Sequence, residues 1–415
     1  MITPRPNQNR LLRFDLGFLL ATEGFAKDGQ KRQNQHDQHP LYSNSNHRQP
    51  SRYGLSVPSH TPSWTPEQEI PILAASMCVR SFIALFLLLF AADLRAESMA
   101  RYGINQDFVW TKDEQIPGLI GAMKEAGVQA VRLPIRWTTV EPERGKWDFV
   151  KVDRVVRALR DAHIEILPIL MSVPTWASGV NPAEVKGFPD TFPAKRTEDW
   201  QEYVRQVVMR YHNDIHFWEI WNEENGEDFY KPTPDAKEYV GILKAAHKTI
   251  RTVDPKAKVV LGGLQMNGII PNPWSPIKVE NFLQKIYDAG GKPYFDVANI
   301  HPYVLATKEQ GPAYASKLVQ DTVSVMEKNG DGRKALWITE TGLGTGNGVT
   351  EEMQAEHLAG IYRGMAKIPE VKAIYWFLLR DMDKSVCGGE DSMGLITTTG
   401  RRKPALEAYS ELAKR

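Results

Sequence analysis

Cysteine is scarce in this chain, which has 415 residues and only two cysteines, Cys78 and Cys387. Cys78 lies in a segment that we expect to be removed, so no intramolecular disulfide is expected. An excess of charge is also lacking, because 51 Lys and Arg against 50 Asp and Glu leave a net charge of +1. That balance gives no electrostatic reason to expect nucleic acid or an anionic membrane surface as a partner.

Two signatures of other folds are also missing. The segment GINQDFVWTKDE, at the first predicted strand, holds no glycine-rich phosphate loop, which disfavours a doubly wound nucleotide-binding sheet. No internal repeat of roughly 20–50 residues occurs, which disfavours a solenoid. The chain does have material for a large core, since 42% of its residues are hydrophobic and 11 are tryptophan.

The first 76 residues differ in composition from the rest. They are crowded with Gln, Asn, Ser, His and Pro and show no apolar periodicity. Such a segment buries too little apolar surface to offset the loss of chain entropy on folding. We therefore expect residues 1–76 to form a disordered extension.

Residues 77–96 have the pattern of a signal peptide. A short basic start ends at Arg80, an apolar run covers 81–92, and the small residue Ala96 follows. The run is too short for a transmembrane helix of about 20 residues, so no stable membrane insertion is expected. We interpret Met77 as the true start of translation and expect a secreted or periplasmic protein. The alternative is a translated cytoplasmic tail with an uncleaved anchor.

Residues 100–415 alternate apolar runs typical of strands with amphipathic helical patterns. Strands are predicted at 102–109, 128–133, 164–171, 215–221, 258–264, 294–301, 335–340 and 371–377. Helices are predicted near 114–126, 148–162, 198–211, 234–253, 276–290, 311–329, 350–368 and 402–413. Eight β-α pairs in succession predict a (β/α)8 barrel as the single catalytic domain.

Reactive groups in such a barrel sit at the carboxyl ends of the strands. The fourth predicted strand ends with Asn222 and Glu223 in HFWEIWNEEN, and the seventh ends with Glu340 in ALWITETG. Either glutamate alone would be interpreted as a solvated surface residue. A facing pair is what glycosidic cleavage needs, with one carboxyl as proton donor and the other attacking or stabilising the sugar carbon. A retaining mechanism requires the two carboxyl groups to lie about 5–5.5 Å apart.

Other polar residues fall at the same predicted rim. His301 and Tyr303 end the sixth strand, and Arg132 interrupts the apolar second strand. A buried arginine needs a partner, and a carboxylate at the barrel mouth is the natural one. For His301 and Tyr303 the alternative is simple packing. Glu219 is interpreted as a structural residue that pairs with a cation inside the barrel.

These motifs together resemble clan A of the glycoside hydrolases: WNE at strand four, HPY at strand six, TETG at strand seven and a tryptophan at strand eight. The closing run WFLLRD…GLITTTGRRKPALEAY resembles the family 39 group and its exopolysaccharide-hydrolase relatives. The resemblance covers essentially Tyr102 to Arg415.

The resemblance implies a role for each matching residue. Glu223 would be the acid/base and Glu340 the nucleophile. Asn222 would hydrogen-bond the 2-hydroxyl of the sugar beside the scissile bond. Tyr303 and Arg132 would orient Glu340 and keep it ionised, whereas the less compensated Glu223 would keep its proton.

The same resemblance places His301 beside the sugar and Trp376 as the floor of the subsite. Trp176, directly after strand three, is the best candidate for a further stacking ring, with core packing as the alternative. One residue departs from the pattern, because such proteins often have proline where this chain has Glu224. A negative charge there would favour the protonated form of Glu223 if the two side chains are close.

Rival functions remain open at this point. His212 and His216 have a four-residue spacing, but a zinc-protease helix would need Glu where Asn213 stands. A carbohydrate-binding barrel without activity is the non-enzymatic alternative. Within the hydrolases, an enzyme acting on a β-linked exopolysaccharide competes with an exo-acting β-xylosidase or β-glucosidase. Acid/base and covalent catalysis need no cofactor and no metal, and carbohydrate is the expected partner. The sequence carries no signal of oligomeric state.

Overall fold

The computed structural model describes residues 102–108, 111–265, 279–304, 311–382 and 390–414. The chain divides into two units, Met1–Pro71 and Ile72–Arg415, and all described residues belong to the second. The expected disordered extension and signal peptide lie outside the described residues.

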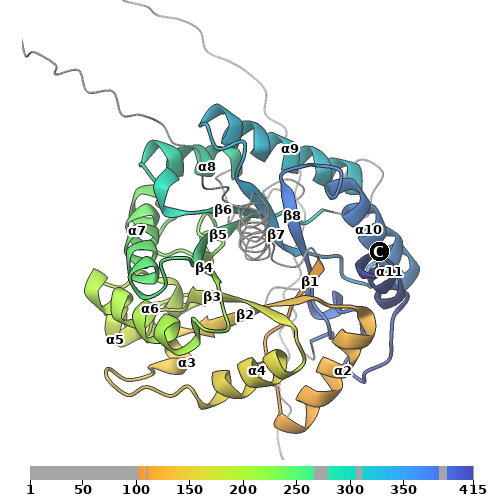
Figure 1. Ribbon diagram of the computed structural model, residues 1–415, viewed down its shortest axis with the longest axis horizontal. Helices are drawn as coiled ribbons and strands as arrows, with labels where there is room; N and C mark the ends of the chain where they lie inside the picture. The colour runs from red at the N-terminus through yellow and green to blue at the C-terminus, as the bar shows by residue number, and fades with distance from the viewer. Residues whose placement is uncertain (1–101, 109–110, 266–278, 305–310, 383–389, 415) are drawn as a thin grey trace, which may run out of the picture. The chain divides into compact units, whose positions relative to one another are not determined.

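Eight parallel strands close into a barrel in chain order, from β1 to β8, with helices around them (Figure 1). The strands are β1 Tyr102–Asn105, β2 Ala130–Arg136, β3 Glu165–Met171, β4 Phe217–Asn222, β5 Lys258–Gln265, β6 Val297–His301, β7 Ala335–Thr341 and β8 Val371–Phe377. The barrel closes where β8 pairs with β1, with Trp376 opposite Ile104. The predicted (β/α)8 barrel is confirmed.

Helices connect successive strands on the outside of the barrel (Figure 1). They are α2 Ile116–Ala126, α3 Trp137–Val140, α4 Val150–Asp161, α5 Thr175–Ser178, α6 Thr197–Tyr211, α7 Ala236–Val253, α8 Val279–Asp288, α9 Pro312–Lys328, α10 Glu351–Met365 and α11 Pro404–Ala413. The predicted helices agree with the long ones to within about three residues at each end. The short α3 and α5 were not predicted, because one helical turn is too short to show an apolar period.

Three strands differ in length from their predictions. β1 ends at Asn105, and the described residues 106–108 of the predicted strand 102–109 lie outside it. β2 continues beyond the predicted end at 133, because Pro134 and the two residues after it stay paired with β3. β6 starts only at Val297, because Lys292–Tyr294 forms a 3-10 turn instead of the predicted first strand residues.

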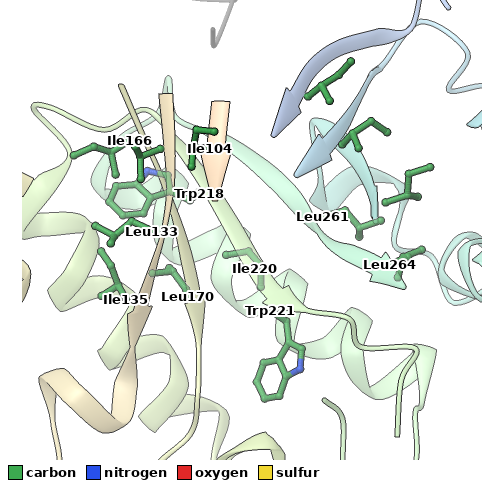
Figure 2. Close-up of a cluster of buried hydrophobic side chains, with 14 of the residues drawn as sticks. Ile104, Leu133, Ile135, Ile166, Leu170, Trp218, Ile220, Trp221, Leu261 and Leu264 are labelled. Carbon is green, nitrogen blue, oxygen red and sulfur yellow. The ribbon is translucent and has the colours of Figure 1, made fainter. Parts of the chain in front are cut away.

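The strands bury one face in the barrel and the other against the helices, since side chains alternate along a strand. The interior cluster comprises Ala130, Leu167, Phe217, Val260, Val297, Trp337, Ala373 and Tyr375. On the outer face Ile135 of β2 is paired with Leu170 of β3, and both appear among the buried side chains of Figure 2. Burying each such aliphatic side chain contributes about 1.5–3 kcal/mol. This packing fixes the strand ends that carry the polar residues.

None of the helices within the described ranges is both long and apolar enough to cross a membrane.

Candidate active site

The two predicted catalytic carboxylates lie side by side at the mouth of the barrel. Glu223 follows directly after the last residue of β4, and Glu340 is the last residue but one of β7. Suitable atoms of Glu223, Glu340 and His301 all lie within 4.8 Å of one another. This separation suits direct attack on the sugar carbon and leaves less room than the roughly 6.5–9.5 Å that an inverting mechanism needs.

Both oxygens of Glu340 are held by hydrogen bonds. The Tyr303 hydroxyl donates to Oε2 over 2.8 Å, and Nη1 of Arg132 donates to Oε1. The glutamate is only 9% exposed. Its carboxylate therefore has a fixed orientation and a cation in direct contact.

Arg132 is the centre of a buried polar cluster. Its Nε and Nη2 donate to the two oxygens of Glu219 over 2.8 and 2.7 Å, and Nη2 also donates to Oδ1 of Asn222 over 2.8 Å. Burial alone would lower the pKa of Arg132, but the carboxylates of Glu219 and Glu340 outweigh it and raise that pKa. The guanidinium stays charged. The prediction that Glu219 pairs with a cation inside the barrel is confirmed.

Glu219 is completely buried, and loss of hydration raises its pKa, although Arg132 counteracts the shift. Nδ2 of Asn299 in β6 donates to Oε1 of Glu219 over 3.0 Å and to Oγ1 of Thr339 over 2.8 Å. Asn299 and Thr339 were not identified from the sequence. Each is a polar residue inside an apolar strand, the same signal that identified Arg132.

Glu223 contacts a histidine ring. Nδ1 of His301 lies 2.9 Å from its Oε1, and Nε2 of the same ring lies 2.9 Å from Oγ1 of Thr339. Burial, and then the nearby Arg132, lowers the pKa of His301 well below its ordinary value. The imidazole is therefore neutral and fixes Glu223 without adding a charge.

A glycine in β5 makes room for this imidazole. A Cβ atom on Gly263 would lie 1.8 Å from Nε2 of His301. The carbonyl of the same glycine accepts a hydrogen bond from the Glu223 amide over 3.0 Å. Gly263 therefore contacts both partners of the Glu223–His301 pair and was missed, because its role depends on the packing between strands.

The structure does not bring Trp376 into this group, contrary to the sequence prediction. Its ring is fully buried in the core between barrel and helices, and its indole N–H donates to the Met393 carbonyl over 2.9 Å. Ala373 and Tyr375 face the barrel interior, so the period of two directs Phe377 to the same side. The Phe377 ring lies edge-on to Tyr303 with 6.4 Å between ring centroids.

Trp176 is half-buried in α5 and packs against the segment that follows β2. Its indole N–H donates to the Glu141 carbonyl over 3.2 Å, and its ring meets Trp137 edge-to-face at 5.4 Å. The Arg144 guanidinium lies 4.4 Å from the ring centroid. Arg144 would have to move before a sugar could stack on that face.

The histidines weighed as metal ligands lie away from the site. His212 caps the end of α6 and His216 is exposed just before β4 begins, so both lie at the opposite end of that strand from Glu223. Within the described ranges, the one group of three metal-ligating side chains close enough to share an ion is Glu223, His301 and Glu340. In that group Glu340 already has the Arg132 cation as its partner.

A closed (β/α)8 barrel with paired carboxylates at the ends of β4 and β7 defines a glycoside hydrolase of the clan A type. The model of the cellulase family, glycosyl hydrolase family 5, matches residues 93–379, and the chain belongs to this family. The predicted membership of clan A is confirmed.

Solved structures of both families 39 and 5 share the fold. A family 39 glycoside hydrolase from the gut symbiont Bacteroides cellulosilyticus WH2 is 21% identical, with a TM-score of 0.57 over 77% of this chain and 64% of that chain. A monomeric β-xylosidase from Caulobacter crescentus CB15 is 18% identical, with a TM-score of 0.59 over 75% and 67%. The GH5_18 protein from Streptomyces cattleya in complex with GlcNAc is 17% identical, with a TM-score of 0.58 over 77% and 80%. At such identities the likeness supports the fold alone.

Among curated proteins, β-galactosidase LacA from Lactobacillus acidophilus is 28% identical in an alignment of 160 residues that covers 34% of this chain and 23% of that protein. The chain thus spans less than a quarter of the length of the curated relatives that it matches.

Proposed function

We propose that the protein is a retaining hydrolase of β-linked O-glycosidic bonds in an oligo- or polysaccharide. The observation that carries the proposal is the pair of carboxyl groups, whose nearest suitable atoms lie within 4.8 Å, with His301 beside them. One carboxylate is bound to a cation and the other to a neutral ring. Two carboxyl groups in such different surroundings are suited to different roles.

The reaction would run in two displacements. In the first, Glu340 attacks the anomeric carbon while Glu223 donates its proton to the leaving oxygen. The sugar–oxygen bond breaks, and a glycosyl ester forms on Glu340. In the second, Glu223 takes a proton from water, which attacks the same carbon and releases Glu340. Two inversions leave the configuration retained.

The supporting residues would act on binding and orientation. Arg132 and Tyr303 hold the Glu340 carboxylate and aim it at the sugar. Because Arg132 holds Oδ1 of Asn222, the amide nitrogen of that side chain is directed away from the guanidinium and is suited to meet the sugar 2-hydroxyl. Phe377 takes the place that the sequence assigned to Trp376 and provides the apolar ring of the subsite.

A bacterial exopolysaccharide is the substrate class that we propose, supported by the resemblance of the closing run to exopolysaccharide hydrolases. The alternative is an exo-acting β-xylosidase or β-glucosidase. The reaction requires no cofactor.

A substrate screen with product analysis tests the function. Purified protein is incubated with exopolysaccharides and with nitrophenyl β-glycosides, and NMR follows the anomeric configuration of the first product. We expect retained configuration from wild type and no product from Glu340→Ala. A product of inverted configuration would exclude double displacement. Wild type that binds these sugars without cleaving any would instead identify a carbohydrate-binding barrel.

We also propose that residues 77–96 direct export, which the short basic start, the apolar run and Ala96 support. Expression of the full gene in a bacterial host, followed by fractionation and N-terminal sequencing, tests this. Mature protein in the periplasm or medium that starts just after Ala96 is expected. Unprocessed protein in the cytoplasm would contradict it.

A further inference from the structure

A tyrosine hydroxyl from the outer helix layer is inserted between two strands next to the acid/base residue. The hydroxyl of Tyr239 in α7 donates to the Ile220 carbonyl of β4 over 2.9 Å. It also accepts from the Gly262 amide of β5 over 2.9 Å. The side chain is completely buried. Tyr239 therefore links β4 and β5 at a single point.

That point is a gap in the ladder between the two strands. Ile220 pairs with Leu261 and Asn222 pairs with Gly263, but the pair between Trp221 and Gly262 is missing. In a regular parallel ladder the Gly262 amide would bond directly to the Ile220 carbonyl. Here the Tyr239 hydroxyl satisfies both backbone groups, each of which would otherwise be buried without a partner.

The gap allows two consecutive residues to serve one site. Alternation along a regular strand would send neighbouring side chains to opposite faces. Yet Asn222 contacts Arg132 and Glu223 contacts His301, both at the barrel mouth. The backbone achieves this with positive φ angles of 74° at Trp221 and 51° at Glu223. Such angles are uncommon for residues other than glycine and persist only where the surroundings hold them.

The residue after the acid/base is buried at the same gap. Glu224 has no exposed surface, and a Cβ atom on Gly262 would lie 2.2 Å from its Oε2. Its carboxyl group is thus packed directly onto the glycine that Tyr239 binds. Among the described residues, neither of its oxygens has a hydrogen-bond partner with good geometry.

Charge on Glu224 is disfavoured in this position. Burial raises the pKa of Glu224 to about 8, which its own backbone amide and the Tyr239 hydroxyl only partly oppose. Glu219 raises it further and Arg132 lowers it, and the hydroxyl of Tyr230 also interacts with this carboxyl. Glu224 is therefore uncharged at neutral pH. This corrects the expectation from the sequence that it places a negative charge beside Glu223.

We propose that Tyr239 and Glu224 are positioning residues for the acid/base: the Tyr239 hydroxyl spans the broken ladder, and the Glu224 carboxyl packs behind it on Gly262. Together they hold the turn from which Glu223 reaches the leaving oxygen. The inference rests on the proposed function of Glu223 and extends it to residues outside the site.

The first test compares Tyr239→Phe with Tyr409→Phe. Tyr409 is a matched control, because it is equally buried in α11 and its hydroxyl has no partner within the described part of the chain. Each variant is assayed on a β-glycoside with a poor, alkyl leaving group and on a dinitrophenyl β-glycoside, whose leaving group needs no proton. We expect Tyr239→Phe to lose about ten- to hundredfold in kcat/KM on the alkyl substrate, and much less on the dinitrophenyl substrate. Tyr409→Phe should match wild type on both.

The difference between substrates separates positioning from folding, because a smaller folded fraction lowers both rates by the same factor. Equal losses on the two substrates, or a Tyr239→Phe variant that behaves like Tyr409→Phe, would overturn the inference while leaving the proposed function intact. Wild type without activity on either substrate would overturn both.

A second test uses Glu224→Gln and remains informative if Tyr239→Phe does not fold. Glutamine keeps the shape of the side chain but cannot ionise. Because wild type acquires a buried charge above pH 8, the ratio of variant to wild-type kcat/KM should rise with pH and reach about tenfold near pH 9. A ratio that stays constant from pH 6 to about pH 9.5 would refute the role of Glu224.

Discussion

Gly263→Ala is expected to lower both the activity and the stability of the enzyme strongly by the addition of one methyl group. The new Cβ atom would lie 1.8 Å from Nε2 of His301, whereas ordinary contacts begin at 3.4 Å. The imidazole or the β5 backbone must therefore move by about 1.6 Å, the difference between these distances. His301 cannot shift this far without breaking its hydrogen bonds, because its two ring nitrogens lie 2.9 Å from their partners, Glu223 and Thr339.

The expected magnitude follows from the steric clash and from the two hydrogen bonds of His301 that the clash breaks. Overpacking a buried site costs about 1–3 kcal/mol, and leaving buried polar groups unpaired costs about 1–3 kcal/mol each. We therefore expect Gly263→Ala to lose at least about 3 kcal/mol of unfolding free energy. Displacing the partner of Glu223 by more than about 1 Å should lower kcat by about a hundredfold.

Urea unfolding and steady-state kinetics measure these effects against Gly241→Ala. A Cβ atom on Gly241 of α7 would meet nothing within 4 Å, and alanine in a helix stabilises by about 0.5–1 kcal/mol over glycine. That control should be fully active and slightly more stable. The decisive comparison introduces Gly263→Ala into the His301→Ala variant, in which the imidazole that would clash with the new methyl group is absent. If the methyl group costs as much stability there as in wild type, the clash with His301 is not the cause and the reasoning fails.

Three further predictions concern other parts of the site. Arg132→Lys keeps the charge but not the fork of donors. We expect a loss in urea unfolding of about 1–3 kcal/mol for each buried acceptor left without its donor, and unchanged stability would contradict the central place of Arg132 in the buried cluster. In wild type the folded state retains the Glu224 proton up to about pH 8, whereas the unfolded chain releases it near pH 4.3. The protonated Glu224 thus contributes stability below about pH 4.3, and wild type loses this stability as the pH rises to 8. The free energy of unfolding of Glu224→Gln should therefore increase relative to that of wild type by about 1.4 kcal/mol per pH unit in this window. A difference between the two proteins that does not grow with pH would refute the burial of an uncharged Glu224. Phe377→Ala should lower kcat/KM, whereas Trp376→Phe should mainly lower Tm, because it loses the hydrogen bond to the Met393 carbonyl. The reverse pattern would show that Trp376, and not Phe377, contacts the substrate.

The fold was predictable because its signals are local and repeated. Each strand is an apolar run and each long helix an amphipathic pattern, and parallel strands bring their carboxyl ends together whatever their sequence. The same logic placed Glu223 and Glu340 at one rim. Arg132 was recognisable because a cation in an apolar strand needs a buried partner.

Other features depend on geometry that the sequence carries weakly or not at all. The alternation of side chains along β8 from Ala373 and Tyr375 indicates that Phe377 faces the barrel interior. The sequence prediction chose Trp376 instead because the resemblance to clan A expects a tryptophan at this strand. The gap at Trp221 has no such signal, because positive φ at a bulky residue is imposed by its surroundings. The role of Gly263 appears only once β5 and β6 are packed together.

The charges of the cluster explain how one glutamate can act first as acid and then as base. Arg132 is shared by two carboxylates, Glu219 and Glu340, so this group has a net charge of −1 when both are ionised. Ionisation of Glu223 would place a second carboxylate charge within 4.8 Å of Glu340, which like-charge repulsion disfavours. We therefore expect Glu223 to hold its proton in the free enzyme. Formation of the glycosyl ester removes the charge of Glu340, and Glu223 can then ionise and serve as the base that activates water.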